Sequence, residues 1–365
     1  MTAQIDYASE YDNSGRVKNS AALVNKYIND AAMFREERGR VAQYDLVYGP
    51  QPRNMMDIFW PNTQLGNAKK SPLVMFIHGG YWQRLDRSAF SHMAAGLNAN
   101  GIAVAIPSYT LCPDITIEGI ITEMRRACLV LFQTFRRKFT VIGHSAGGHL
   151  AACMMATDWE GLNSGLPHDL VKSGLGISGI YDLRPLLHTP INDVINLNEE
   201  QAIAASPIHW VPDALHQFDA WVGDEESREF HRQSQDLAAK WGLLGTPTQY
   251  ISEPGTNHFT VIDALTRPDS LMVNRILELA RNPDIKVELP EVDDTAIDAI
   301  LNPPEAQAET QETVDEISEP QPDAAAKKPA KKTSRKSKDA KSRPKASIGG
   351  KAPPGKLKKK PKKSN

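Results

Sequence analysis

A serine flanked by glycines two positions away on each side is the first residue whose surroundings suggest chemistry. The stretch GHSAG occupies residues 143–147, with Ser145 at its centre. An apolar run typical of a strand (residues 139–142) precedes it, and small residues typical of a helix (residues 146–156) follow it. A strand–turn–helix of this kind exposes the serine hydroxyl on a strained turn, where small neighbours avoid clashes. We therefore predict that Ser145 is a nucleophile.

A second motif could stabilise the negative charge that a serine attack produces. The stretch HGGYW follows an apolar run at residues 73–77. Paired glycines let the backbone approach a reacting carbonyl and present N–H groups to an oxyanion. We expect the N–H groups of Gly80 and Tyr81 to form an oxyanion hole together with that of Ala146, which begins the helix after the serine.

A serine nucleophile needs a base, and the base needs an acid that orients it. His258 lies in the stretch TNHF, in a loop after the last apolar strand-like run, where a histidine can reach the serine. The acid should follow the strand predicted at residues 218–222. Three carboxylates occur there, Asp224, Glu225 and Glu226. Spacing from the strand end favours Glu226, and the other two stay open as alternatives.

The elements that must position these residues alternate between strands and helices. Such alternation predicts a doubly wound, mostly parallel α/β sheet with right-handed crossovers, entered by an antiparallel hairpin. Residues 182–217 interrupt the alternation and are predicted to be a small cap insertion that faces the substrate. The predicted strands are residues 43–48, 55–60, 73–77, 102–106, 139–142, 175–178, 218–222 and 248–252, and the predicted helices are residues 20–36, 88–99, 116–136, 146–156, 229–241 and 272–280.

The charge distribution divides the chain into a body and a tail. The net charge of -2 hides a segment, residues 327–365, with 17 Lys and Arg against one acid. Before it, residues 286–326 are acidic, rich in proline and free of aromatic residues, so they cannot bury enough apolar surface to fold. We predict one domain over residues 1–285, followed by an acidic disordered linker and a lysine-rich disordered tail.

Composition also bears on location and cofactors. The sequence has no run of about 18 apolar residues that would span a membrane. Its N-terminus lacks the charged and apolar regions of a secretory signal. Three scattered cysteines suit neither a disulfide framework nor a zinc site. We expect a cytoplasmic protein that needs no metal or cofactor.

These motifs resemble the α/β-hydrolase superfamily and its hormone-sensitive-lipase-like branch. The pattern H-G-G-x-W, rather than H-G-G-G, is similar to the kynurenine formamidase (arylformamidase) family. Further similar stretches are YGPQPRNMMDIFWP, SYTLCP, GHSAGGHLAA, EFHRQS and HFTVIDAL. The resemblance covers about residues 20–280 and leaves out the tail. In that family the acid precedes an S-P-E-F-like segment, and the matching segment SREF (residues 227–230) again selects Glu226, although the family more often has Asp.

The resemblance implies that Ser145 attacks the formyl carbon of N-formyl-L-kynurenine, with His258 as base and Glu226 as the acid that orients it. The products would be kynurenine and formate. Trp82 and Tyr109 are candidate walls for an aromatic substrate, and either could equally belong to the core.

Two other functions stay open. A carboxylesterase acting on small acyl or aryl esters would use the same residues, so the sequence does not separate amide from ester hydrolysis. Alternatively, the basic tail could bind nucleic acid or another polyanion, because its cations would release counterions from phosphates. The tail could also be solubilising or pair with the acidic linker. The sequence predicts no oligomeric state.

Overall fold

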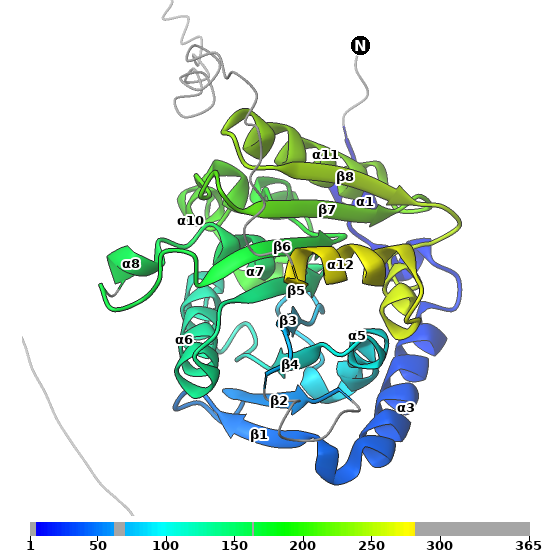
Figure 1. Ribbon diagram of the computed structural model, residues 1–365. Helices are drawn as coiled ribbons and strands as arrows, with labels where there is room; N and C mark the ends of the chain where they lie inside the picture. Colours follow the sequence, from blue (N-terminus) through cyan, green and yellow to red (C-terminus); the bar gives the residue numbers. More distant parts are fainter. Residues whose placement is uncertain (1–4, 62–69, 163, 282–365) are drawn as a thin grey trace, which may run out of the picture. The chain divides into compact units, whose positions relative to one another are not determined.

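A single mixed sheet organises the residues that the computed structural model describes, which are 5–61, 70–162 and 164–281 (Figure 1). Within these residues the strand order is β1-β2-β4-β3-β5-β6-β7-β8. The first two pairings, β1 with β2 and β2 with β4, are antiparallel, and all the others are parallel. The strands are β1 (Gln43–Val47), β2 (Met55–Phe59), β3 (Leu73–Ile77), β4 (Ala103–Pro107), β5 (Phe139–His144), β6 (Val171–Ile177), β7 (Gln217–Gly223) and β8 (Thr248–Glu253).

Helices cover both faces of the sheet, and α6 and α12 lie on opposite sides in Figure 1. This confirms the predicted doubly wound α/β architecture. The helices and 3-10 turns are α1 (Tyr7–Glu10), α2 (Asn13–Arg16), α3 (Ser20–Arg38), η1 (Gly39–Val41), η2 (Arg87–Ala94), α5 (Ala95–Ala99), α6 (Ile117–Phe135), α7 (Ala146–Met155), α8 (Trp159–Leu162), η3 (Arg184–His188), α9 (Asn192–Ile195), α10 (Glu199–Ala204), η4 (Pro207–His209), α11 (Arg228–Leu243), η5 (Val261–Thr266) and α12 (Leu271–Arg281).

The continuous apolar run of β3 explains why the core has two halves. Side chains alternate between the faces of a strand, so a strand covered on both faces is apolar throughout. Leu73, Met75 and Ile77 belong to the core half beneath α6, α7 and α11. Val74 and Phe76 belong to the half beneath α3, η2, α5 and α12. All five side chains are buried, which makes β3 the centre of the body.

Two elements differ from the sequence-based prediction. The helix predicted at residues 88–99 is a 3-10 segment, η2, that continues into the short helix α5. Strand β6 begins at Val171, four residues before the predicted start. Glycines weaken the strand pattern in this stretch. Gly174 is nevertheless required for packing, because a Cβ there would lie 2.8 Å from the Phe218 ring.

The predicted insertion at residues 182–217 forms short helical segments, η3 to η4, between β6 and β7. It is tied to the body by Gln233 of α11, whose side-chain oxygen accepts hydrogen bonds from the backbone N–H groups of Tyr181 and Asp182, both at 2.8 Å. The insertion therefore begins at a fixed point on the buried face of α11.

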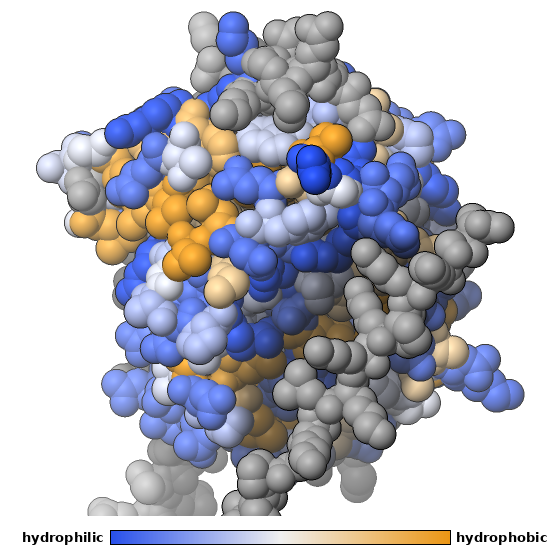
Figure 2. Space-filling view, turned by 90° about the horizontal axis from the view of Figure 1, so that it is seen from below, coloured by the Kyte–Doolittle hydropathy of each residue, from blue (hydrophilic) through white to orange (hydrophobic). Residues whose placement is uncertain are grey.

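The acidic linker and the lysine-rich tail predicted at residues 286–326 and 327–365 lie outside the described residues. In the part that is described, no helix combines the length and the apolar character needed to cross a membrane. Figure 2 shows hydrophobic residues on one face as separate patches among hydrophilic ones.

Candidate active site

Ser145 sits on a strained turn between β5 and α7. Its φ of 57° and ψ of −119° fall in a region that non-glycine residues rarely adopt. Both flanking glycines are needed there. A Cβ on Gly143 would lie 2.0 Å from the carbonyl oxygen of Gly147, and a Cβ on Gly147 would lie 2.0 Å from that of Ile77. The turn is fixed further by the Ser145 N–H, which donates to the Ile177 carbonyl at 2.8 Å.

The glycine loop after β3 lies against this turn. A Cβ on Gly79 would lie 3.0 Å from the Ser145 Cβ, so the loop backbone passes directly beside the serine. Gly80 has a φ of 121°, and Tyr81 has a φ of 50°. Ala146 begins α7, and the first N–H groups of a helix have no acceptor within the helix. Gly80 and Tyr81 line the same cavity as Ser145, and Ala146 follows the serine directly in the chain.

The loops after β7 and β8 bring a carboxylate to a histidine. Glu226 Oε2 lies 2.7 Å from His258 Nδ1. Glu226 Oε1 accepts hydrogen bonds from the Ser178 hydroxyl at 2.5 Å and from the Gly223 N–H at 2.8 Å. Both Glu226 and His258 are buried. When Nδ1 donates its hydrogen to a carboxylate, Nε2 of the same ring is left free to accept a proton.

The two other candidate acids lie elsewhere. Asp224 and Glu225 are exposed. Asp224 Oδ1 accepts hydrogen bonds from the N–H groups of Gly255 at 2.7 Å and Thr256 at 3.3 Å, and thereby ties its own loop to the one that carries His258.

His144, inside the serine motif, positions the histidine loop. Its Nε2–H donates to the carbonyl of His258 at 2.9 Å. Burial is the main reason why the pKa of His144 lies well below its usual value, and neighbouring His258 lowers it further. The ring is therefore neutral near pH 7 and serves as a hydrogen-bond donor.

Ser145 and His258 both line a cavity of about 140 Å³, together with Gly79, Gly80, Tyr81 and His144. The residues predicted to cover it, 182–217, contribute none of the lining residues. Instead, the cavity is bordered by the N-terminal segment, which comprises α1, α2 and α3 (residues 7–38). Its lining residues are Asn13, Ser14, Val24 and Tyr27. The sequence predicts a helix over residues 20–36 that packs on the body or acts as a lid, and the structure places this segment at the border of the cavity.

The N-terminal segment reaches the site through tyrosine hydroxyls. The Tyr81 hydroxyl donates to the carbonyl of Tyr11 at 2.6 Å and accepts from the side-chain amide of Asn13 at 3.1 Å. The Tyr27 hydroxyl donates to the carbonyl of Phe259, next to His258. The segment is thus bonded to both the glycine loop and the histidine loop.

The two aromatic residues expected to form substrate walls lie in the core instead. Trp82 and Tyr109 are fully buried, and neither lines the cavity. The Trp82 ring meets His149 edge-on at 5.1 Å, and the Tyr109 ring stacks on His78 at 4.4 Å. Tyr81, between the two glycines and Trp82, lines the cavity instead.

This arrangement suits acyl transfer to a serine. It combines a hydroxyl on a strained turn, an imidazole held by a carboxylate, and a glycine loop whose backbone passes beside the serine. In the described part of the chain, the side chains grouped so that they could hold a metal ion lie away from this cavity, at His168, Asp213 and His216.

Comparison with known proteins agrees with this arrangement. A family model described as BD-FAE matches residues 56–241. The kynurenine formamidase of Salmo salar is 31% identical over 243 residues, which cover 64% of this chain and 81% of the relative. That of Danio rerio is 28% identical over 245 residues, which cover 64% and 80%. A crystal structure from Silicibacter sp. tm1040, described as a candidate thioesterase, is 32% identical with a TM-score of 0.66, covering 75% of this chain and 99% of the other.

The matched segment spans half of the chain, from β2 to α11, and includes the serine turn, the glycine loop and Glu226. The chain therefore belongs to the BD-FAE family of α/β-hydrolases, and it is a hydrolase similar to the kynurenine formamidases.

Proposed function

We propose that this hydrolase is a serine arylformamidase that converts N-formyl-L-kynurenine to kynurenine and formate. One observation carries the proposal. His258, whose Nδ1 lies 2.7 Å from Glu226 Oε2, lines the same cavity as Ser145, in a chain whose relatives include three kynurenine formamidases.

The reaction would proceed in two steps. His258 Nε2 takes the proton of the Ser145 hydroxyl while the serine oxygen attacks the formyl carbon. The N–H groups of Gly80, Tyr81 and Ala146 hold the resulting oxyanion, and each such donor typically lowers the barrier by about 3–4 kcal/mol. His258 then gives its proton to the departing arylamine. Water, activated by the same histidine, releases formate from the formyl-serine.

The lining of the cavity supports an aromatic substrate that carries a carboxylate. Tyr27, Tyr81, Phe90 and Phe259 contribute aromatic side chains to it. Arg84 also lines the cavity and is exposed. A guanidinium recognises a carboxylate by two parallel hydrogen bonds, and N-formylkynurenine has a carboxylate at the end away from its formamide. Arg84 was not found from the sequence, where it lies among ordinary polar residues after HGGYW.

A carboxylesterase is the second candidate, because the same residues cleave esters and one related structure is described as a candidate thioesterase. The deciding experiment compares kcat/KM for N-formyl-L-kynurenine, formanilide and p-nitrophenyl acetate. We expect the highest value for N-formyl-L-kynurenine, and a lower value for formanilide because it lacks the carboxylate. Higher kcat/KM for the nitrophenyl ester than for both formamides would favour the esterase.

Two further parts of the proposal concern the surroundings of the enzyme. A cytoplasmic location is supported by three free, buried cysteines, Cys112, Cys128 and Cys153, which suit a reducing compartment. Binding of nucleic acid or another polyanion by residues 327–365 is supported by their 17 Lys and Arg.

A further inference from the structure

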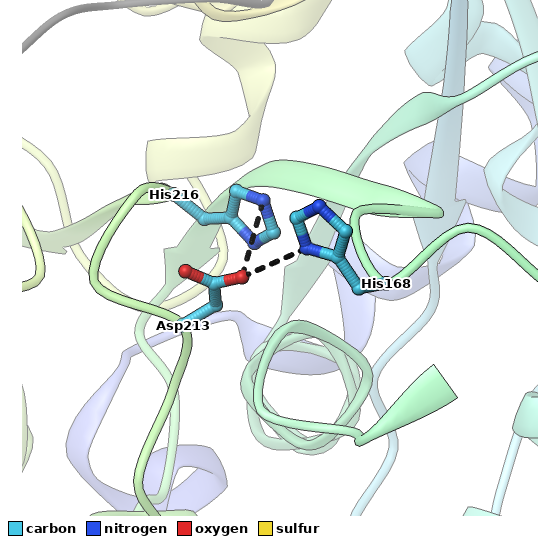
Figure 3. A group of neighbouring side chains, drawn as sticks. All are labelled: His168, Asp213 and His216. Carbon is cyan, nitrogen blue, oxygen red and sulfur yellow. Dashed lines mark hydrogen bonds and ion pairs between the residues drawn. The ribbon is translucent and has the colours of Figure 1, made fainter. Parts of the chain in front are cut away.

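Three potential metal ligands converge at the end of the sheet opposite the cavity. His168 lies in the loop before β6, and Asp213 and His216 lie in the loop before β7 (Figure 3). Strands β6 and β7 are parallel neighbours, so these two loops meet at the amino ends of the strands. Ser145, Glu226 and His258 all follow the carboxyl ends of their strands. The cluster is therefore separate from the proposed catalytic site.

The donor atoms of the cluster face one another. Asp213 Oδ2 lies 3.1 Å from His168 Nδ1 and 3.8 Å from His216 Nε2, and the three donor atoms lie within 4.8 Å of one another. In Figure 3 dashed lines join this one carboxylate oxygen to a ring nitrogen of each histidine. Tetrahedral zinc, with bonds of about 2.0–2.2 Å, spaces its donors about 3.4 Å apart. Shifts of about 1 Å in the side chains would bring all three donors within bonding distance of one ion.

Two of the three ligands are already held in place. His216 directly precedes β7, and its side chain is only 5% exposed. Asp213 Oδ1 accepts a hydrogen bond from the Leu215 N–H at 2.9 Å, and the Asp213 carbonyl accepts one from the His216 N–H at 3.1 Å. These bonds leave Oδ2 facing the two imidazoles. A donor set fixed before binding loses little conformational entropy when the ion arrives.

The third ligand is free to adjust. The His168 side chain is 56% exposed, and its ring lies nearly parallel to that of His216, with 11° between the planes and 6.0 Å between the centroids. Its exposure leaves room for water as a fourth ligand on the solvent side. Two imidazoles and one carboxylate form a donor set that favours zinc and similar transition metals over calcium or magnesium, which prefer oxygen ligands.

We propose that His168, Asp213 and His216 bind a divalent transition-metal ion, with Zn²⁺ as the probe. The ion links the loop before β6 to the loop before β7, replaces the direct His168–Asp213 hydrogen bond, and stabilises the folded body. The role is structural, because the site lies at the other end of the strands from Ser145.

The test uses the full chain, freed of metal with a chelator and titrated with ZnCl₂ by isothermal calorimetry. Two variants address the site, His168→Ala, which changes an exposed side chain, and Asp213→Asn, which keeps the side-chain shape. His188→Ala is the matched control, since it also removes an exposed histidine, one that stacks on Tyr7 rather than facing a carboxylate. Cobalt(II) is a second probe, because its visible absorption reports tetrahedral coordination by nitrogen and oxygen.

We expect one Zn²⁺ per chain, with affinity at least about tenfold weaker in both site variants and unchanged in His188→Ala. Free zinc at about 100 times Kd should raise the Tm of the wild-type chain by about 5 °C, and the rise should shrink in both variants. Absence of stoichiometric binding would overturn the proposal and leave His168–Asp213 as an ordinary ion pair. Binding that is as tight in His168→Ala and Asp213→Asn as in the wild type would overturn it too, because the ion would then lie elsewhere.

Discussion

Glu226→Gln tests the proposed triad through the proton positions on His258. The carboxylate of Glu226 makes three contacts, with the Gly223 N–H and the Ser178 hydroxyl on Oε1 and with His258 Nδ1 on Oε2. A backbone N–H can only donate, so a glutamine keeps its carbonyl oxygen toward Gly223 and turns its NH₂ group toward His258. Nδ1 must then accept a hydrogen bond, and the ring proton moves to Nε2. The nitrogen that should take the proton of Ser145 no longer has a free lone pair.

The expected loss follows from this change of tautomer. In serine proteases the equivalent carboxylate-to-amide change costs about 10⁴-fold in kcat, so we expect kcat/KM to fall by about 10³–10⁴-fold. This corresponds to about 4–5.5 kcal/mol of transition-state stabilisation. The assay is steady-state hydrolysis of N-formyl-L-kynurenine and of p-nitrophenyl acetate, with the Tm of each variant measured to verify folding. Both substrates should be affected alike, because the defect lies in the base.

Two neighbouring carboxylates supply the controls. Glu225 is exposed, so Glu225→Gln should stay within about twofold of the wild type, as is usual for surface changes. Asp224→Asn should cost at most about tenfold in kcat/KM, since it only weakens the bonds from Asp224 to the loop carrying His258. The assignment of the acid is refuted if Asp224→Asn is more damaging than Glu226→Gln. A Glu226→Gln enzyme that folds and keeps more than a tenth of wild-type kcat/KM would refute it as well.

Four further outcomes are expected. Ser145→Ala should lower kcat by at least about 10³-fold and abolish labelling by a fluorophosphonate probe without lowering Tm, and a loss below about tenfold would rule out this nucleophile. Arg84→Met should raise KM for N-formyl-L-kynurenine by about tenfold or more while leaving formanilide kinetics unchanged. Equal effects on both substrates would rule out the contact between Arg84 and the substrate carboxylate. Burial lowers the pKa of His78 and of His149 to about 4, so between about pH 6.5 and pH 4 the unfolded chain binds protons that the folded chain does not. The contribution of these two rings to the free energy of unfolding should be complete above pH 6.5 and fall below it by up to about 1.4 kcal/mol per pH unit for each ring. Urea denaturation at pH 7.5 and pH 5 should therefore give a lower midpoint at pH 5. Deletion after residue 285 should keep hydrolysis within a few-fold of the full chain and weaken binding to DNA or RNA at low salt in a gel-shift titration; equal gel shifts for both chains would end the nucleic-acid hypothesis, and lost hydrolysis would move the domain boundary.

The strands could be predicted from the sequence because burial on both faces leaves a local signal. The run LVMFI predicts the bounds of β3 as the structure has them. The same signal fails in β6. Gly174 is required there because the Phe218 ring of the neighbouring strand leaves no room for a Cβ, and this contact is not visible in the local sequence. Local patterns carry propensity and periodicity, but they do not carry contacts between distant segments.

The residues proposed for chemistry could be found for a similar reason. The serine turn, the glycine loop and the histidine each sit at the end of a strand, and parallel strands bring those ends together. Which aromatic ring faces the cavity could not be read, because left-handed backbone at Gly80, Tyr81 and Trp82 breaks the alternation from which facing is inferred. The sequence therefore indicated Trp82, whereas Tyr81 lines the cavity.

The N-terminal segment connects closure of the cavity to the geometry of the reacting groups. Tyr11 and Tyr27 of this segment form hydrogen bonds with one residue in or next to each of three loops of the site. Tyr81 lies in the glycine loop, Phe259 follows His258, and Glu229, three residues after Glu226, accepts a hydrogen bond from the Tyr11 hydroxyl at 3.0 Å. The three loops come from distant parts of the chain, and this segment bonds to all of them. A segment that only covered the cavity would affect substrate entry alone, whereas one that also holds the loops would contribute to the alignment of the proposed base, acid and oxyanion donors.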